Sequence, residues 1–347
     1  MLSSFLEDLS SALSTLDNWK DRPSLRPRLT WVLMANGEAE PDDNIILFGF
    51  EGDSPKPIMV AKIPRLPKNE WMLQIEYDHL MEAWHRLGAQ AVFRLPEPLA
   101  LLRLRGQPAL VLTYLDGESL LRASKKRFWE YSTQVRDFFV DSAQSLREMN
   151  DLTSVPLRTD LNLVASYIQK IEKFKELNNL SEHELNALGE LVVCLNTQTL
   201  AATHMVLLQG DFWHGNIIRG SEHGKLMFLD WQYSHWSSDI SLDVYMFLLA
   251  AALAAVPRRS DEERAKDAIR VLMNWRSGTI PAYLSAYGKP DRYSLLPARY
   301  GMLLCCIEKN VRSVIDFGHN QQGDSVWRAL FSELVNLSEE SDFCDGI

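Results

Sequence analysis

The stretch LLQGDFWHGNIIR, residues 207–219, places an aspartate, a histidine and an asparagine directly after an apolar run. The apolar residues predict a buried strand, so Asp211 is expected on a loop at the strand end, where a rigid scaffold holds it. Asn216 can then face the same space. A second apolar segment, KLMFLD at 225–230, brings Asp230 to the end of another predicted strand. Two carboxylates and one amide oxygen are hard-oxygen ligands of the kind that Mg²⁺ prefers, which predicts a metal site.

These residues have the spacing found in protein kinases. There, an aspartate that accepts the substrate proton is followed by a metal-binding asparagine and then by a metal-binding aspartate. The strings GDFWHGN (210–216) and LDWQ (229–232) resemble the motifs H-G-D-L-H-x-G-N and I-D-W of the aminoglycoside phosphotransferase and choline kinase superfamily, including its ecdysteroid-kinase-like members. The resemblance covers roughly residues 28–250, and its sharp motifs are these two.

The resemblance implies a protein-kinase-like α+β fold with a small antiparallel β-sheet lobe and a large, mainly helical lobe. It implies transfer of the γ-phosphate of ATP, with GTP as a further possibility, to a hydroxyl of a small metabolite, amino sugar, amino alcohol or antibiotic. By this resemblance, Asp211 would accept or orient the hydroxyl proton. Asn216 and Asp230 would hold Mg²⁺, which bridges phosphate oxygens.

The upstream segment is expected to supply the residues that bind the nucleotide. Lys62 lies near the end of a predicted strand in PIMVAKIPR (57–65), like the lysine of the V-A-I-K motif, and would contact the inner phosphates. Glu76, in the following predicted helix, would hold that lysine, although Glu70 and Glu82 compete for this role.

The connector VLTYLDG (111–117) resembles the hinge of the family. Main-chain groups near Thr113 and Leu115 would bind the edge of the adenine ring there. Because every residue offers main-chain groups, a neighbouring position would serve equally well.

Two departures from the family pattern leave an alternative open. Gln209 replaces the histidine that normally holds the loop, although glutamine can also donate and accept hydrogen bonds. The turn MANGEAEPDDN (34–44) has one glycine, and its acids would repel phosphates if they pointed inward. The alternative is a catalytically silent nucleotide-binding or scaffolding relative. A protein kinase is disfavoured because no A-P-E segment lies between Asp230 and Asp243. Asp243 is expected to brace the loop, with Asp239 as its rival.

The order of the predicted elements divides the chain into three parts. Residues 1–25 contain an amphipathic helix at 2–16, residues 26–117 form a β-rich nucleotide-binding lobe with its hinge, and residues 118–347 form a helical lobe with the catalytic loop and the substrate site. In the β-rich part, strands are predicted at 29–37, 44–52 and 57–65, a helix at 70–87, and a hairpin at 100–115 around Gly106-Gln107-Pro108. In the helical part, strands are predicted at 205–209 and 225–230 alone, and helices near 126–150, 159–176, 181–202, 240–256, 261–275 and 295–316.

Composition limits the partners and the compartment. The 46 acidic residues outnumber the 36 basic ones, and a net charge of -10 argues against a nucleic-acid partner and favours cationic or neutral small molecules. The four cysteines show no metal or disulfide spacing. Glu7 and Asp8 argue against a signal peptide, and the longest apolar run, 244–256, is too short to span a bilayer. We therefore expect a cytoplasmic protein with no membrane partner, whose oligomeric state stays open.

The acceptor is less well determined by the sequence. Four aromatic residues near the two motifs offer ring faces for a quaternary ammonium or a sugar, although core packing explains them equally well. They are Trp213, Trp231, Tyr233 and Trp236. The acidic end, SEESDFCDGI (338–347), would suit a cationic substrate, or would be a solvated tail.

Overall fold

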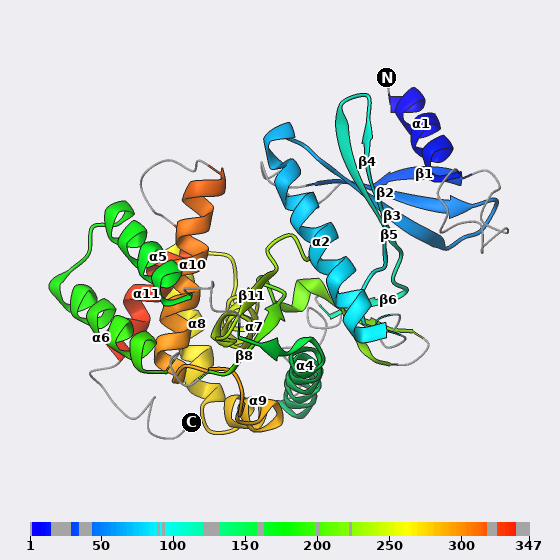
Figure 1. The fold of residues 1–347 in the computed structure, drawn as a ribbon. Helices are drawn as coiled ribbons and strands as arrows, with labels where there is room; N and C mark the ends of the chain where they lie inside the picture. The colour runs from blue at the N-terminus through cyan, green and yellow to red at the C-terminus, as the bar shows by residue number, and fades with distance from the viewer. Residues whose placement is uncertain are drawn as a thin grey trace. The chain divides into compact units, whose positions relative to one another are not determined.

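The computed structural model describes residues 2–14, 29–34, 44–88, 91, 94–120, 132–157, 163–198, 202–221, 224–317 and 325–337. The chain divides into two compact units, whose elements are labelled in Figure 1. The first unit comprises Met1–Gly117 and Ile218–Ser234, and the second comprises Glu118–Ile217 and His235–Ile347. Residues 218–234 therefore group with the β-rich part, whereas the sequence analysis places them in the helical lobe. Within the described ranges, no helix is both long and apolar enough to cross a membrane.

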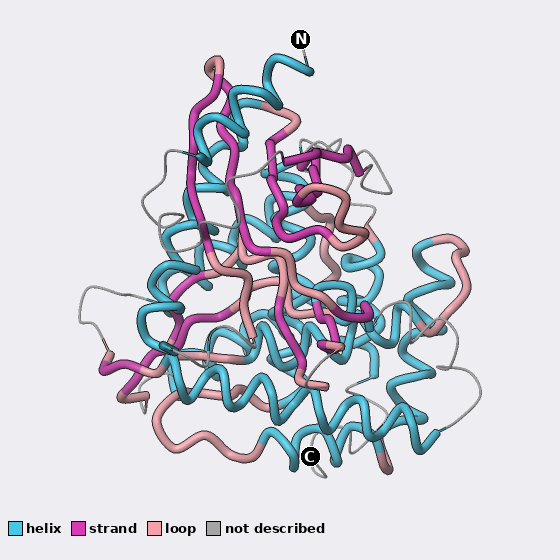
Figure 2. Tube along the Cα trace, turned by 90° about the vertical axis from the view of Figure 1, so that its right-hand side faces the viewer, coloured by secondary structure: helices cyan, strands magenta, loops and turns pink. Residues whose placement is uncertain are grey.

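The first unit is built on a five-stranded sheet in the order β1-β2-β3-β5-β4. Every adjacent pair in it is antiparallel. Figures 1 and 2 show the long strands of this sheet side by side. The central strands carry the apolar runs because both of their faces are covered. The strands are β1 (Leu29–Met34), β2 (Asn44–Glu51), β3 (Pro57–Pro64), β4 (Pro98–Leu104) and β5 (Gln107–Thr113).

The β4–β5 hairpin turns one residue earlier than the sequence predicts. Arg105 and Gly106 form the turn with φ angles of 52° and 82°. Two successive positive φ angles suit a tight hairpin, because they match the twist of the strands. Pro108 lies inside β5 opposite Arg103, and the pairing of β5 with β3 begins only at Leu110. The missing N–H of Pro108 therefore falls outside the part of β5 that pairs with β3.

Two helices cover this sheet. Helix α1 (Leu2–Ser14) buries Phe5 and Leu9 against residues of the sheet. Helix α2 (Glu70–Leu87) follows the short turn η3 (Pro67–Asn69) and contacts β3, β4 and β5 (Figure 1). Its buried residues recur at helical spacing, and each large apolar side chain buried there contributes roughly 1.5–3 kcal/mol. They are Met72, Leu73, Glu76, Leu80, Ala83 and Leu87.

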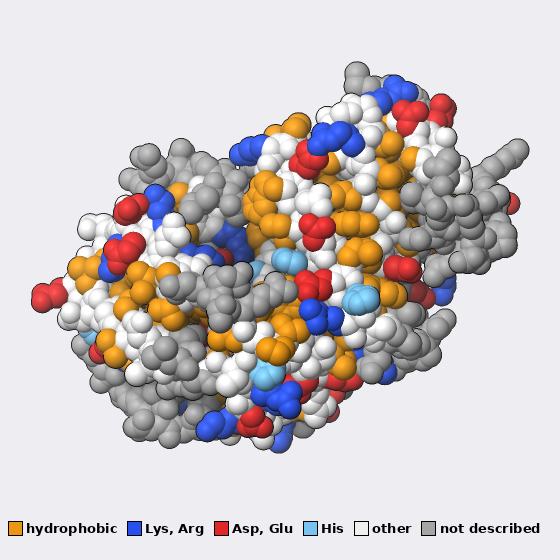
Figure 3. Space-filling view, in the orientation of Figure 1, with side chains coloured by type: hydrophobic (Ala, Val, Ile, Leu, Met, Phe, Trp, Pro, Cys, Tyr) orange, Lys and Arg blue, Asp and Glu red, His pale blue; other side chains and the backbone are white. Residues whose placement is uncertain are grey.

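The opposite side of α2 reaches solvent. Trp71 and Met81 remain 46% and 45% exposed. Figure 3 shows hydrophobic side chains on this face of the helix. Single exposed apolar residues are common on protein surfaces, so this face needs no partner to explain it.

The segment Ile218–Ser234 belongs to the first unit through a small apolar cluster. Strands β9 (Ile217–Gly220) and β10 (Leu226–Phe228) are neighbours, and Ile218 and Met227 pack against Leu115. The Phe228 N–H also donates to the carbonyl of Arg94 at 2.8 Å. Strand β9 is absent from the sequence predictions because four residues carry too little periodicity to detect.

The second unit is mainly helical, with a small sheet in the order β11-β8-β7. Its strands are β7 (Val155–Pro156), β8 (His204–Leu208) and β11 (His235–Ser237), and the short strand β6 (Gly117–Ser119) lies where the chain passes from the first unit. Its helices are α4 (Ser132–Thr153), α5 (Leu163–Leu177), α6 (Glu182–Gln198), α7 (Ser241–Ala254), α8 (Asp261–Trp275), α9 (Thr279–Tyr287), α10 (Ala298–Phe317) and α11 (Val326–Leu337).

Several of these elements depart from the sequence predictions. Four short strands, β6, β7, β9 and β11, are present in addition to the two predicted for this part of the chain. Helices α9 and α11 are also additional. Pro281 lies in the first turn of α9, where a missing N–H costs no helical hydrogen bond, but the same residue disguises the helix in the sequence.

Helix α7 forms the centre of the second unit. Its apolar run, predicted to be a core helix, is buried on nearly all sides. Helix α10 packs closely on it because Gly301 has no side chain. A Cβ atom at Gly301 would lie 2.1 Å from the ring of Tyr245. The Tyr245 hydroxyl is buried and donates to the carbonyl of Leu296 at 2.7 Å.

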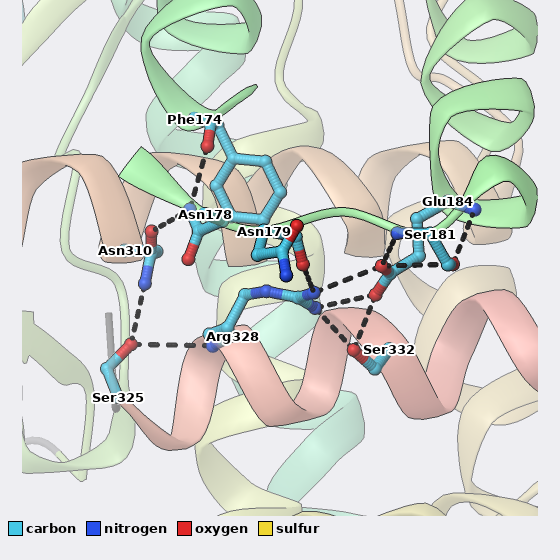
Figure 4. A network of polar contacts seen from close by, with 9 residues as sticks. All are labelled: Phe174, Asn178, Asn179, Ser181, Glu184, Asn310, Ser325, Arg328 and Ser332. Carbon is cyan, nitrogen blue, oxygen red and sulfur yellow. Dashed lines mark hydrogen bonds and ion pairs between the residues drawn. The ribbon is translucent and has the colours of Figure 1, made fainter. Parts of the chain in front are cut away.

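A polar network joins α6 and α11 (Figure 4). Glu184 on α6 accepts hydrogen bonds from both terminal nitrogens of Arg328 on α11, at 2.7 and 3.0 Å. Ser332 donates to the same carboxylate at 2.6 Å. Burial alone would raise the pKa of Glu184, but Arg328 and Ser332 outweigh burial and lower this pKa to about 2. The pair therefore clamps the two helices.

Candidate active site

A buried lysine in the first unit is bonded to two carboxylates. The Lys62 ammonium donates to Glu76 Oε1 and Oε2 at 2.6 and 2.8 Å, and to Asp230 Oδ1 at 2.8 Å. Strand β3, helix α2 and the chain after β10 supply the three residues. Lys62 is 9% exposed and Glu76 is fully buried. The structure thus brings together the residue predicted to bind phosphates, Lys62, the residue predicted to hold it, Glu76, and a predicted metal ligand, Asp230.

The charges of this cluster depend on one another. Burial disfavours the ammonium, but Asp230 and Glu76 outweigh it and hold the pKa of Lys62 well above its ordinary value. Burial also raises the pKa of Glu76, and Lys62 opposes that rise. A buried ammonium flanked by two acids stays charged at neutral pH, as a phosphate-binding lysine must.

The backbone at Asp230 has an uncommon conformation. Its φ angle is 58°, in the left-handed region that aspartate enters more readily than most residues. The next residue is fixed on both sides: the Trp231 N–H donates to Glu76 Oε1 at 3.3 Å, and its indole nitrogen donates to the Phe228 carbonyl at 3.0 Å. Strained conformations of this kind persist where the surroundings fix them, and they cluster at functional sites.

The two expected hinge residues have different surroundings. The Thr113 N–H already donates to the Glu97 carbonyl at 2.9 Å, and the Thr113 hydroxyl accepts from the Glu97 N–H at 2.7 Å. Leu115 is 9% exposed and packs against Ile218 and Met227. The N–H of Thr113 is therefore engaged within the sheet, which leaves Leu115 as the better candidate of the two for an adenine contact.

In the second unit, Asp211 and Asn216 lie on one tightly bonded loop. Asn216 is at the end of the short helix η6 (His214–Asn216), and its side-chain nitrogen donates to the Asp211 carbonyl at 3.1 Å and to Asp211 Oδ2 at 3.2 Å. Gly210 before them has a φ angle of 79°, which only glycine adopts without cost. The structure therefore places these two predicted side chains next to each other.

Gln209 and Asp243 hold this loop from behind. The Gln209 side-chain oxygen accepts from the Asp211 N–H at 2.7 Å, so glutamine orders the loop in place of the family histidine. The Asp243 carboxylate accepts from the N–H groups of Gln209 and Gly210 at 2.8 and 2.9 Å. Burial raises the pKa of Asp243 to about 7. Its rival for this role, Asp239, instead binds Ser241 at the start of α7.

Comparison with known proteins identifies a family whose sequence model covers these site residues. A sequence model described as "Phosphotransferase enzyme family" matches residues 56–291, more than half of the chain. The chain belongs to this family. The match includes Lys62, Asp211 and Asp230, and it confirms the resemblance predicted from the two motifs. No curated protein matches the chain.

Three solved structures share the fold of this family member. A proposed aminoglycoside phosphotransferase from Ralstonia eutropha JMP134 has a TM-score of 0.56 and 12% identity, covering 98% of each chain. A choline/ethanolamine kinase family protein from Mesorhizobium loti has a TM-score of 0.52 and 12% identity, covering 98% of this chain and 96% of that one. Macrolide 2'-phosphotransferase type I has a TM-score of 0.50 and 14% identity, covering 91% and 94%. These likenesses confirm the predicted protein-kinase-like α+β fold.

Helix α10 of this family member supplies two basic residues to the Asp211 loop, and neither is predicted from the sequence. The Lys309 ammonium forms an ion pair with Asp211 Oδ1. The Arg312 guanidinium donates to the Gly210 carbonyl at 3.2 Å and to Glu308 at 3.0 Å. Lysine and arginine three positions apart share one face of a helix, but that spacing is too common to reveal a site.

The donors fit the predicted Mg²⁺ site in kind. Because the side-chain nitrogen of Asn216 faces Asp211, its side-chain oxygen is the atom left for a metal ion. In the first unit, Asp230 has a carboxylate, and Mg²⁺ favours amide and carboxylate oxygens together with substrate phosphates. Within the described part of the chain, no group of three or more His, Cys, Asp or Glu side chains is placed to hold a metal ion.

The aromatic residues near the motifs differ in burial: Trp213, Tyr233 and Trp236 are partly exposed. Trp231 is fully buried in the first unit. The ring of Trp213 lies edge-on to His214, which is itself buried, and a Cβ atom at Gly215 would meet the Trp213 ring at 2.4 Å. Core packing thus accounts for Trp231.

Two acidic segments that the sequence singles out lie outside the described residues. They are residues 35–43 of the turn and the acidic end, 338–347.

Proposed function

We propose that the protein transfers the γ-phosphate of ATP, or of GTP, to a hydroxyl group of a small molecule. The observation that supports this most is the buried Lys62 ammonium bonded to both Glu76 and Asp230. Glu76 keeps the Lys62 ammonium charged, as the binding of nucleotide phosphates requires. Asp230, on a strained backbone beside this ammonium, has a carboxylate that can bind a metal ion. Family membership makes a phosphotransferase the first reaction class to consider.

Each residue has a defined part in this reaction. Lys62, held by Glu76, binds inner phosphate oxygens, and main-chain groups near Thr113 and Leu115 bind the base. Asn216 and Asp230 would hold Mg²⁺, which supplies charge compensation at the phosphates when bound.

Asp211 orients the acceptor hydroxyl and takes its proton. Asn216 fixes one of its oxygens from the same loop. Asp243 fixes the preceding main chain. The contribution of these residues is position and charge, which dominate phosphoryl transfer.

The test is phosphate transfer to a panel of hydroxylated metabolites, followed by the mass increase of one phosphate, with and without Mg²⁺. Asp211→Ala should lose at least about 10²-fold in kcat, because positioned acid–base groups contribute about 10²–10⁴-fold. Asp53→Ala, at an exposed position outside the site, should retain the full rate. ATP binding without transfer or hydrolysis in the unchanged protein would instead favour a catalytically silent relative.

A further inference from the structure

Both oxygens of the Asp211 carboxylate are paired within the protein. The Lys309 ammonium contacts Oδ1 and the Asn216 amide contacts Oδ2. The Lys309 and Asp211 side chains are only 19% and 14% exposed. A mostly buried ammonium of this kind needs a nearby anion, because burying an unpaired charge is costly.

The neighbouring acid on α10 is paired with other cations. Glu308, the preceding residue on α10, is bound by Lys170 at 2.6 Å and by Arg312 at 3.0 Å. Burial alone would raise the pKa of Glu308, but Lys170 and Arg312 outweigh it and lower this pKa to about 2. Glu308 is therefore ionised and already has two cations of its own. Asp211 is the acid to which the Lys309 ammonium is paired.

We infer that the acceptor carries an anionic group, a carboxylate or a phosphate ester, close to its reacting hydroxyl, and that Lys309 binds this group. The inference rests on the proposed function. In the reaction, the acceptor O–H gives its proton to Asp211, its oxygen bonds to the γ-phosphorus, and the bond from that phosphorus to the β–γ bridging oxygen breaks. The nucleoside diphosphate leaves with that electron pair.

Charge explains why an anionic acceptor suits this step. When Asp211 takes the proton, it loses its negative charge and the Lys309 ammonium loses its partner. An acceptor with its own anion beside the hydroxyl supplies a new partner at that moment. A cationic acceptor would compete with Lys309 for Asp211 Oδ1 and would meet a like charge at short range. This reverses the expectation of a cationic or neutral acceptor drawn from the net charge of the chain.

The experiment compares matched acceptors that differ in one charge. Glycerate is compared with glycerol, and gluconate with glucose, to test an acceptor with a carboxylate. Glycerol 3-phosphate is compared with glycerol to test a phosphate ester. Ethanolamine and kanamycin test cationic acceptors. We expect kcat/KM to be at least about tenfold higher for the anionic member of a pair, as one charge-assisted contact allows. Lys309→Met should remove this preference, so that the ratio of kcat/KM between the two members of a pair falls toward one. Lys309→Arg should retain it.

Controls separate charge from folding. Lys173→Met removes an exposed lysine of α5 that is paired with Glu176, and it should leave the preference unchanged. The circular dichroism spectrum and the Tm of Lys309→Met report whether the variant is folded. Best activity on a cationic acceptor, or an equal change on all acceptors in Lys309→Met, would overturn the inference while leaving the proposed function standing.

A binding measurement keeps the two proposals apart. Malonate carries the anionic group without a hydroxyl, so it should raise the Tm of the unchanged protein and not that of Lys309→Met, and putrescine should raise neither. Malonate binding that depends on Lys309, in a protein that transfers no phosphate, would contradict the proposed function and support the anion site. If malonate raises the Tm of both proteins equally, or of neither, Lys309 is not an anion-binding residue.

Discussion

Glu76 Oε1 accepts hydrogen bonds from both the Lys62 ammonium, at 2.6 Å, and the Trp231 N–H, at 3.3 Å. One buried carboxylate thus holds the lysine and the main chain immediately after Asp230. Nucleotide binding and the stability of the first unit are therefore expected to depend on the same side chain.

Glu76→Gln should weaken both properties. It keeps the shape of the side chain but leaves Lys62 with Asp230 as its one remaining acid in this cluster. Removing one partner of a buried pair costs about 3–5 kcal/mol, so the urea midpoint should fall clearly and KM for ATP should rise. Glu82→Gln, in a surface pair with Arg86 on the same helix, should cost at most about 0.5 kcal/mol. Equal stability losses in the two variants would contradict this role of Glu76.

The stability of the protein should depend on pH through Asp243. Burial raises its pKa from an ordinary 3.8 to about 7, so the folded state binds a proton that the unfolded state releases. The stabilising contribution of the protonated group is complete below about pH 4. As the pH rises toward 7, the free energy of unfolding should fall by at most about 4 kcal/mol.

Asp243→Asn should remove this part of the pH dependence. Urea unfolding from pH 4.5 to 7.5 should show a smaller decrease in the variant than in the unchanged protein. Burial also raises the pKa of Asp239, to about 6, but that group is present in both proteins and cancels in the difference. Parallel pH profiles would show that Asp243 is ionised throughout.

Two glycines in helices should respond oppositely to alanine. Gly301→Ala places a Cβ atom 2.1 Å from the Tyr245 ring, and overpacking of this kind costs about 1–3 kcal/mol. Gly189→Ala, on the exposed side of α6, meets nothing within 4 Å and should stabilise by about 0.5–1 kcal/mol, since alanine favours the helix. Thermal unfolding measures both. A stabilised Gly301→Ala protein would refute the close contact of α10 with α7.

The clamp between α6 and α11 should fail at low pH. The pKa of Glu184 is lowered to about 2, so the ionised carboxylate stabilises the folded protein. This stabilisation is complete above the ordinary pKa of glutamate and is lost as the pH falls through 2. Arg328→Met removes the guanidinium and should return this pKa toward its ordinary range, so the variant should lose less stability between pH 5 and pH 2. A double-mutant cycle with Glu184→Gln measures the coupling, and additive effects would show that the two side chains act independently.

The sequence predicts the elements with strong local signals and fails where the determinants are distant. Lys62 and Glu76 lie on a strand and a helix that apolar periodicity predicts, and Asp211 and Asn216 share a motif with fixed spacing. Lys309 contacts Asp211 across 98 positions of sequence, and nothing local to α10 marks it. Main-chain groups near Thr113 are expected at the adenine, yet the Thr113 N–H is bonded to Glu97, just before β4, and this bond depends on how β4 and β5 meet. Short strands such as β7 and β11 form because β8 lies beside them, not through their own propensity.

The first unit is discontinuous in the chain, because residues 218–234 belong to it together with the residues up to Gly117. A fragment truncated after Gly117 would expose Leu115, which packs against Ile218 and Met227 in the intact protein. It would also leave the Glu76 carboxylate without the Trp231 N–H. The first unit cannot be excised by a single cut, so insertions, fusions and truncations must respect both stretches.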